Sequence, residues 1–494
     1  MMKTSKTTFY TIAIFLWMCC GSCSRQLDVS PTSVITTTSF WQTEDDANGA
    51  LTGMYISLRD VAVNIYRSEI RSDVYEGGVS GTGGDFADIQ GNTLTPTNPG
   101  HPGWAGYYRA INDANLILKY VPEISFTSEA AKQRILAEAY TTRAYMHYII
   151  SKTWGDAIIR DEPIESSSAE VTQRERSPQT EVFAFIKQDL EQAIALFPDD
   201  SFPSGRMRWS RAAANAVKAD VNLFTGKRLG GGSADFSNAL AAIEAIEGTD
   251  TGLLPDFADI FRYDNKGNRE LLMVIHHDVI EGGLFLHFTW FGSQLPANVG
   301  EESRNLILPT GNGIGLLVAT QLVRNQFSMT DSRRDATFHE VFAYDANGNA
   351  TYYTNVNLKF SGIVEGGTRY FTNDAILYRY ADVLLMKAEA KNALGQDPSV
   401  EMNEIRRRAF GSAFNNHIFV NGSQEENETL ILRERLLELL FEGKRWDDLV
   451  RYGKVFDIVP NLQSRRDEQH LLLFPIGNNI LNTEPLVVQN PGYE

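Results

Sequence analysis

The sequence predicts a mainly α-helical protein: a tetratricopeptide-like helical-repeat scaffold with a large irregular loop and an insertion of short strands. Three observations predict this fold class. Apolar residues recur at helical spacing over the first half of the chain and again near its end. Small residues such as Ala388 and Ala390 would let neighbouring helices pack closely, as in tetratricopeptide hairpins, although no strict repeat length is kept. Between residues 251 and 370 the pattern changes to short apolar runs, glycine turns and aromatic residues.

The N-terminus resembles a bacterial lipoprotein signal. Lys3 and Lys6 precede an apolar run, residues 9–18, that is too short to span a bilayer. Gly21, Ser22 and Cys23 then resemble a lipobox, so residues 1–22 are expected to be removed and Cys23 to be lipidated. Cys20 stands where that pattern prefers leucine. Lipidation of Cys20 and an uncleaved N-terminal anchor remain the alternatives.

Composition excludes several classes of function. All 3 cysteines lie within the first 23 positions, so a chain lipidated at Cys23 has no disulfide, cysteine nucleophile or cysteine-based zinc site. The formal net charge is −17 and no basic cluster stands out, which argues against nucleic acid as a partner. The acidity favours neutral or cationic ligands. No residue pattern predicts a cofactor or a metal site.

The first helix of the scaffold is expected to begin after Thr43, a plausible N-cap followed by the acidic residues Glu44, Asp45 and Asp46. A long Gly/Pro/Asn-rich stretch, residues 68–103, interrupts the helical pattern; loops of this length are usually functional or disordered. Further helical stripes are expected around residues 104–118, 135–149, 182–196, 212–224, 238–246, 381–392, 402–408 and 432–440.

The insertion is expected to contain a buried strand over residues 271–276 and a half-buried strand over residues 284–291. No linker divides the mature chain, so residues 23–494 are expected to form one domain. Within it, the helical scaffold covers about residues 39–250 and 371–455, and the ligand-binding insertion about 251–370. The C-terminal signature segment is residues 471–494.

Several segments together resemble the SusD/RagB family of Bacteroidetes outer-membrane lipoproteins. The matching segments are Phe40-Trp41, Trp104 to Asn115, Arg143 to Tyr145, Trp154 to Asp156, Arg379 to Met386, Glu434 to Arg451 and the tail from Pro475 to Tyr493. The chain departs from the family pattern at Trp154, Ala157, Gly477, Ile480 and Glu484. These departures affect packing and turns rather than a binding site.

The resemblance implies a cell-surface lipoprotein, anchored in the outer membrane by its N-terminal lipid. It would bind an oligosaccharide, or in some members a peptide, and deliver it to a SusC-type TonB-dependent transporter. The family carries no catalytic residues, so no enzyme activity is expected. Two other hypotheses stay open: an extracytoplasmic glycoside hydrolase that uses two carboxylates, and a purely structural helical adaptor.

A neutral glycan site needs exposed aromatic rings and polar side chains that bond to hydroxyl groups. Trp104 ends the long loop and is one candidate, although its helical stripe with Tyr108 would equally suit the core. Trp290 and Phe291 lie in the insertion, where strand alternation would expose one of them, and Trp290 is expected to be the exposed one. Asp73 and Tyr75 offer a carboxylate beside a ring, and a solvated turn is the alternative there.

Three other signals are weaker. His276 and His277 would diverge in a strand, so a metal site is not expected. Gly226 and Lys227 lack the spacing of a phosphate-binding loop. Of the adjacent Tyr352 and Tyr353, at most one would face a ligand.

Replacement of Cys23 by alanine should leave the precursor unprocessed or release it from the outer membrane, because the lipid acceptor is gone. Mass spectrometry of the mature N-terminus, with and without Cys23→Ala, measures this. A membrane-bound wild-type form that still carries residues 1–22 would contradict the assignment.

Overall fold

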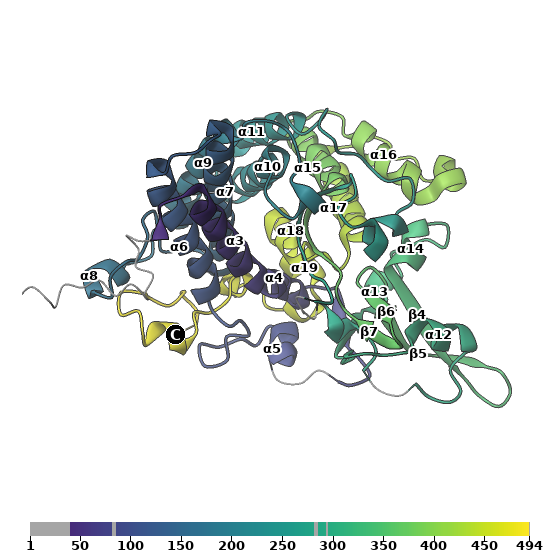
Figure 1. Cartoon of the computed structure of the whole chain (residues 1–494). Coiled ribbons are helices and arrows are strands. Elements are labelled where there is room, and N and C mark those ends of the chain that lie inside the picture. The colour runs from purple at the N-terminus through teal and green to yellow at the C-terminus, as the bar shows by residue number, and fades with distance from the viewer. Residues whose placement is uncertain (1–39, 82–84, 281–284, 293–294, 494) are drawn as a thin grey trace, which may run out of the picture.

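The computed structural model describes residues 40–493, apart from 82–84, 281–284 and 293–294 (Figure 1). Cys23 and the expected signal peptide therefore lie outside the described residues. Within the described part of the chain, no helix is both long and apolar enough to cross a membrane.

The expected helical scaffold is confirmed. Its first part contains α3 (Glu44–Asp60), α4 (Ala62–Ile65), α5 (Asp85–Gly91), α6 (Ala105–Tyr120), α7 (Glu129–Trp154), α8 (Ala169–Thr172), α9 (Gln179–Leu196), α10 (Arg211–Arg228) and α11 (Gly232–Glu244). Helix α7 packs against α6 and α9, and α10 packs against α11, which gives tetratricopeptide-like pairs of neighbouring helices (Figure 1).

Local sequence explains where the first helix begins. Thr43 is the N-cap of α3: its hydroxyl accepts a hydrogen bond from the Asp46 N–H, and the Asp46 carboxylate accepts one from the Thr43 N–H. This reciprocal capping box satisfies N–H groups that a helix leaves unpaired at its start. The sequence-based N-cap is therefore confirmed.

A second group of helices completes the scaffold: α15 (Tyr380–Ala393), α16 (Ser399–Phe410), α17 (Gln424–Leu439), α18 (Arg445–Tyr452), α19 (Val455–Ile458) and α20 (Asn478–Leu481). Helix α15 packs against α11 on one side and against α16 and α17 on the other. It therefore joins the two groups of helices, although they are far apart in sequence.

The short strands of the described residues lie in and around the insertion and form two-stranded pairs. The antiparallel pairs are β1 (Tyr75–Gly77) with β3 (Leu317–Ala319), β2 (Leu271–Ile275) with β8 (Ala375–Arg379), β4 (Phe338–Tyr344) with β5 (Ala350–Asn357), and β6 (Ile363–Glu365) with β7 (Thr368–Tyr370). Three short helices accompany them: α12 (Glu301–Ile307), α13 (Gln321–Arg324) and α14 (Ser332–Thr337).

One expected strand of the insertion is confirmed and the other is wrong. Every residue of β2 is buried, as its continuous apolar run predicts. The described part of residues 284–291 is not a strand, because Leu286 adopts a left-handed conformation (φ 53°) and His287–Thr289 form a 3₁₀ turn. The turn ends the alternation on which the strand prediction depended.

The C-terminal segment folds back onto the scaffold. The Tyr493 hydroxyl donates to the Leu473 carbonyl at 2.8 Å, and the Asn490 amide donates to the Phe474 carbonyl at 3.0 Å. Arg176 donates to the side chain of Asn490 at 2.9 Å. The first two bonds close the C-terminal segment on itself, and the bond from Arg176 joins it to the stretch between α8 and α9.

A network of buried charges, which we call the Arg379 network, joins the insertion to the helices. Arg379 at the end of β8 contacts three carboxylates: Glu442 at 2.7 Å, Glu438 at 2.6 Å and Glu270 at 3.0 Å. Its outer members are Lys359, which pairs with Glu442 at 2.7 Å, Arg333, which pairs with Glu438 at 3.1 Å, and Arg408, which pairs with Glu270 at 2.7 Å.

The arginines of the network keep the buried Glu438 carboxylate ionised. Burial alone would raise the pKa of Glu438, but Arg408, Arg379 and Arg333 together hold that pKa below its ordinary value. Burial lowers the pKa of Lys359 to about 8, while Glu442 opposes this shift. Such groups stabilise a fold only while each has its partners.

Replacement of Arg379 by leucine should therefore destabilise the protein by about 3–5 kcal/mol, the usual effect of breaking a buried ion pair. Urea unfolding followed by circular dichroism measures the change. Arg262→Leu is the control, because its partners Asp259 and Asp264 are solvent-exposed and the midpoint should not move. Equal midpoints for the two variants would contradict the role of the network.

Glu69 lies beside this network and should make stability depend on pH. Burial raises its pKa to about 8, from an ordinary value of 4.5, although Gly443 N–H and Lys359 oppose the shift. Between these pH values Glu69 is ionised in the unfolded chain and protonated in the folded protein. The free energy of unfolding therefore falls as pH rises.

Glu69→Gln should remove this penalty. The variant should match the wild type at about pH 4.5 and become progressively more stable than it as the pH rises to about 8. Urea unfolding at several pH values measures the difference. A difference that is the same at both ends of this range would contradict the raised pKa.

Candidate functional site

The two expected tryptophan platforms are buried, which corrects the prediction of open stacking surfaces. Trp104 is 4% exposed at the start of α6, where it packs edge-on against Tyr108 and Trp154 with ring centroids 5.9 and 5.8 Å away. Of the two sequence-based alternatives, the structure therefore favours a core position for Trp104.

Trp290 is 1% exposed and its neighbour Phe291 is also buried. The Arg369 guanidinium lies over the Trp290 ring, 4.2 Å from its centroid, and Phe291 packs near Tyr353. Both residues are buried because they follow the turn at Leu286, where strand alternation does not apply. The expectation that Trp290 is exposed is wrong.

Asp73 and Tyr75 are buried as well, so they do not form a solvated turn. The Asp73 carboxylate accepts two hydrogen bonds from the Arg445 guanidinium, at 2.8 and 2.9 Å. Tyr75 stacks on Phe441 with ring centroids 5.5 Å apart, and burial holds its pKa well above the ordinary value. Of the five expected ligand-binding residues, only Asp73 lines the large cleft described below.

The adjacent pairs diverge as expected. Tyr352 is 37% exposed with Arg324 over its ring, whereas Tyr353 turns toward Phe291. His276 bonds to Asp374, whereas His277 is buried and stacks on Phe285. Among the residues that the structure describes, no group of three or more His, Cys, Asp or Glu side chains is arranged to hold a metal ion.

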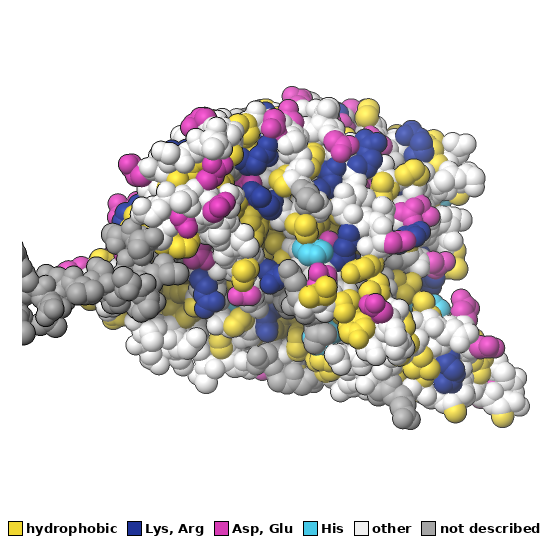
Figure 2. All heavy atoms as spheres, viewed as in Figure 1, with side chains coloured by type: hydrophobic (Ala, Val, Ile, Leu, Met, Phe, Trp, Pro, Cys, Tyr) yellow, Lys and Arg dark blue, Asp and Glu magenta, His cyan; other side chains and the backbone are white. Residues whose placement is uncertain are grey.

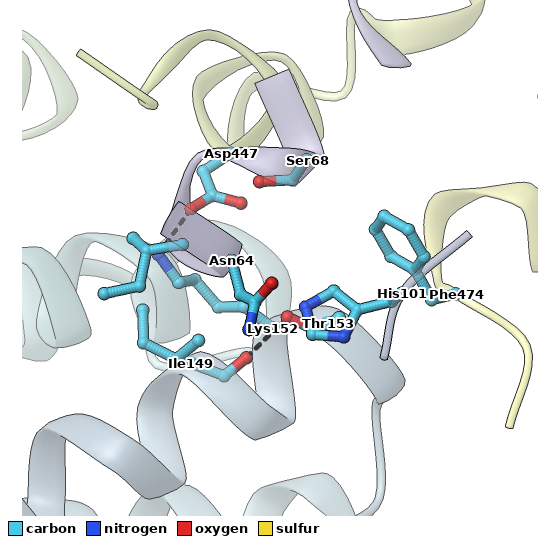
Figure 3. A pocket seen from close by; sticks show the side chains of 9 residues that line it. Asn64, Ser68, His101, Ile149, Lys152, Thr153, Asp447 and Phe474 are labelled. Carbon is cyan, nitrogen blue, oxygen red and sulfur yellow. Dashed lines mark hydrogen bonds and ion pairs between the residues drawn. The ribbon is translucent and has the colours of Figure 1, made fainter. Parts of the chain in front are cut away.

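The cavities differ greatly in size. One small cavity of about 10 Å³ lies between α7, α18 and Phe474, where Lys152 points toward Asp447 at 2.5 Å (Figure 3). It has room for about one water molecule. On the face shown in Figure 2, acidic and basic side chains are interspersed over the helices, and hydrophobic side chains gather near the middle and over the insertion.

A cleft of about 520 Å³, which we call the α17 cleft, lies where the insertion meets the C-terminal helices. Small-ligand sites in proteins are typically about 300–1,000 Å³ and mostly apolar. Its walls are aliphatic and come from α13, α17 and α19: Leu322, Val323, Leu432, Leu436 and Ile458. Its floor contains the Asp73–Arg445 pair and Tyr452, all three buried.

Helical spacing explains why α17 lines this cleft. Thr429, Leu432, Arg433 and Leu436 are three or four residues apart, so they share one face of the helix. Glu438 projects from the opposite side into the Arg379 network. The network thus fixes the rotation of α17 that turns its other face toward the cleft.

The carboxylates of the cleft are already neutralised by cations. Glu428 on α17 forms an ion pair with Lys227, and Asp457 pairs with Arg466 at 2.6 Å. The Lys227 ammonium also lies over the Tyr452 ring, 4.0 Å from its centroid. Burial holds the pKa of Tyr452 well above its ordinary value, so its hydroxyl keeps its proton. An uncharged ligand therefore suits this cleft.

A second cavity of about 280 Å³, which we call the His417 cavity, lies beside the cleft. Its lining is more polar and includes Ser328, Arg406 and Glu434, together with Phe410 and His417. The rings of Phe410 and His417 stack with centroids 3.8 Å apart and an interplanar angle of 8°.

The sequence did not reveal these lining residues as a site. Leu432 and Leu436 match the core-facing stripe of a helix, and only the position of α13 shows that they border open space. Phe410 and His417 come together because the chain reverses after α16, where Gly411 has φ 46°. Glycine tolerates this conformation, and the glycine directly after the apolar stripe is the only local signal of the reversal.

Two family models match the chain. The model described as "SusD family" matches residues 323–459, and the model described as "Starch-binding associating with outer membrane" matches residues 27–223. SusD-like protein P2 of Formosa agariphila is 27% identical over 536 aligned residues, with all of both chains covered.

Solved structures agree with these matches. Bacteroides fragilis NanU is 31% identical with a TM-score of 0.82, and the match covers 94% of this chain and 100% of that one. A SusD superfamily protein from Bacteroides vulgatus is 30% identical with a TM-score of 0.82, and the match covers 91% of this chain and 99% of that one.

Proposed function

This chain belongs to the SusD family, and on that premise we propose that it captures a carbohydrate at the cell surface. It would be anchored in the outer membrane through lipid on Cys23 and would pass its ligand to a SusC-type TonB-dependent transporter. The matching model's description, "Starch-binding associating with outer membrane", supports carbohydrate binding and association with the outer membrane. A laminarin-binding SusD-like protein shares the fold, with a TM-score of 0.72 at 22% identity.

The α17 cleft is the observation on which the proposed function depends. Its aliphatic walls, such as Leu432 and Leu436, would cover the C–H faces of a sugar. Rim side chains such as Thr429 and Gln463 would bond to its hydroxyl groups. The carboxylates that line the cleft already have cationic partners, so the cleft does not require a cationic ligand.

The role proposed is binding without chemistry. The descriptions of the matching model and of the laminarin binder name binding rather than a reaction. A peptide is the second candidate ligand, because the aliphatic wall of Val323, Leu432 and Leu436 would also accept an apolar side chain. Expected ligand contacts at Trp104, Tyr75, Trp290 and Phe291 are replaced in this proposal by the cleft that Asp73 borders.

Thr429→Trp should block the cleft and weaken glycan binding at least about tenfold, because the indole would occupy the ligand's space. Affinity gel electrophoresis against a panel of polysaccharides that includes starch and laminarin identifies the ligand. Isothermal titration with that ligand then measures the loss.

Thr52→Trp is the matched control. Thr52 on α3 is exposed and donates its hydroxyl hydrogen to the carbonyl four residues before it, as Thr429 does. It does not border the cleft. Equal glycan affinity for both variants would contradict the cleft as the site. Release of shorter sugars by the pure protein would contradict a binding-only role, and binding of a peptide library in place of glycans would favour the second candidate.

A further inference from the structure

The α17 cleft and the His417 cavity share two lining residues, Gln326 and Arg433. On α17, Leu432 and Leu436 face the cleft while Glu434 and Leu437 face the cavity, and Arg433 lies between the two sets. Gln326 follows α13, on the side of the cleft opposite α17. The two spaces are therefore neighbours along one helix, separated by a single residue position on each side.

Arg433 spans this boundary. Its Nη2 donates to the Gln326 carbonyl oxygen at 3.0 Å, and this bond links α17 to the segment that follows α13. A guanidinium carries five N–H donors, so this bond uses only one of them. In the described part of the chain, Arg433 has no carboxylate within ion-pair distance, whereas Arg406 nearby pairs with Glu434 at 2.7 Å. The exposed Arg433 side chain thus has donors available to a ligand.

The two spaces differ in chemistry in a way that suits successive units of one chain. The cleft offers aliphatic walls, and the His417 cavity offers a stacked aromatic pair together with Ser328 and Arg406. His417 is fixed in place, because its ring bonds to Thr330 at 3.1 Å and its carbonyl accepts from Arg406 at 3.2 Å. A sugar ring has C–H faces that pack on such surfaces and hydroxyl oxygens that accept from arginine.

We propose that the α17 cleft and the His417 cavity form one groove for an extended neutral oligosaccharide, and that Arg433, at the boundary between the two spaces, makes the affinity depend on the length of the ligand. This inference depends on the proposed function, because it assumes a carbohydrate ligand. A short sugar fills the cleft alone, whereas a longer one passes Arg433 and gains the contacts of the His417 cavity. Arg433 is then a specificity-determining residue for chain length.

Oligomers of two to seven units, prepared from the polysaccharide that binds in the glycan panel, test the inference by isothermal titration. The wild-type affinity should rise at least about tenfold with length and then level off. Arg433→Ala should lower the affinity of the long oligomers about tenfold more than that of the shortest, so the dependence on length disappears. Arg407→Ala is the control, because Arg407 is exposed on the adjacent helix α16 and lines neither cavity.

The possible failures are distinguishable. Carbohydrate binding that does not depend on length, or that Arg433→Ala weakens equally at every length or not at all, overturns the groove and leaves the proposed function standing. Failure of every carbohydrate in the panel to bind overturns the proposed function and this inference together. Equal melting temperatures for Arg433→Ala and Arg407→Ala exclude an effect of misfolding.

Discussion

The structure depends most on the requirement that the buried charges of the Arg379 network remain paired. Arg379, Glu438 and Glu270 are all 0% exposed, so each would be strongly unfavourable without its partners. These charges come from β8, α17 and the residue before β2, and Arg408 of α16 joins them. An arrangement of the insertion and the helical scaffold that separated these partners would leave buried charges unpaired, which strongly favours the observed one.

The same requirement positions the candidate site. Helix α17 turns Glu438 into the network, and this orientation leaves Thr429, Leu432 and Leu436 on the face that borders open space. A second buried ion pair, Asp73 with Arg445, ties the loop before β1 to α18 and forms the floor of the cleft. Buried charges thus set the geometry, while the surfaces that would touch a ligand are aliphatic or uncharged.

Most of the scaffold was predictable from sequence, and most of the site was not. The capping box at Thr43, the helical stripes and the buried strand β2 depend on residues close together in the chain. The burial of Trp104 and Trp290 depends on Trp154 and Arg369, which are far away in sequence. Asp73 was identified as a polar residue near a site, but its pairing with Arg445 required the fold.

Carbohydrate should occupy the groove along α17, which α13 of the insertion borders. A crystal structure of the protein with a bound oligosaccharide, taken from the polysaccharide that it binds in solution, tests this claim most directly. Sugar units should lie against Leu432 and Leu436, with the oligosaccharide passing Arg433 toward His417. Sugar bound elsewhere, with the α17 cleft and the His417 cavity empty, would contradict it.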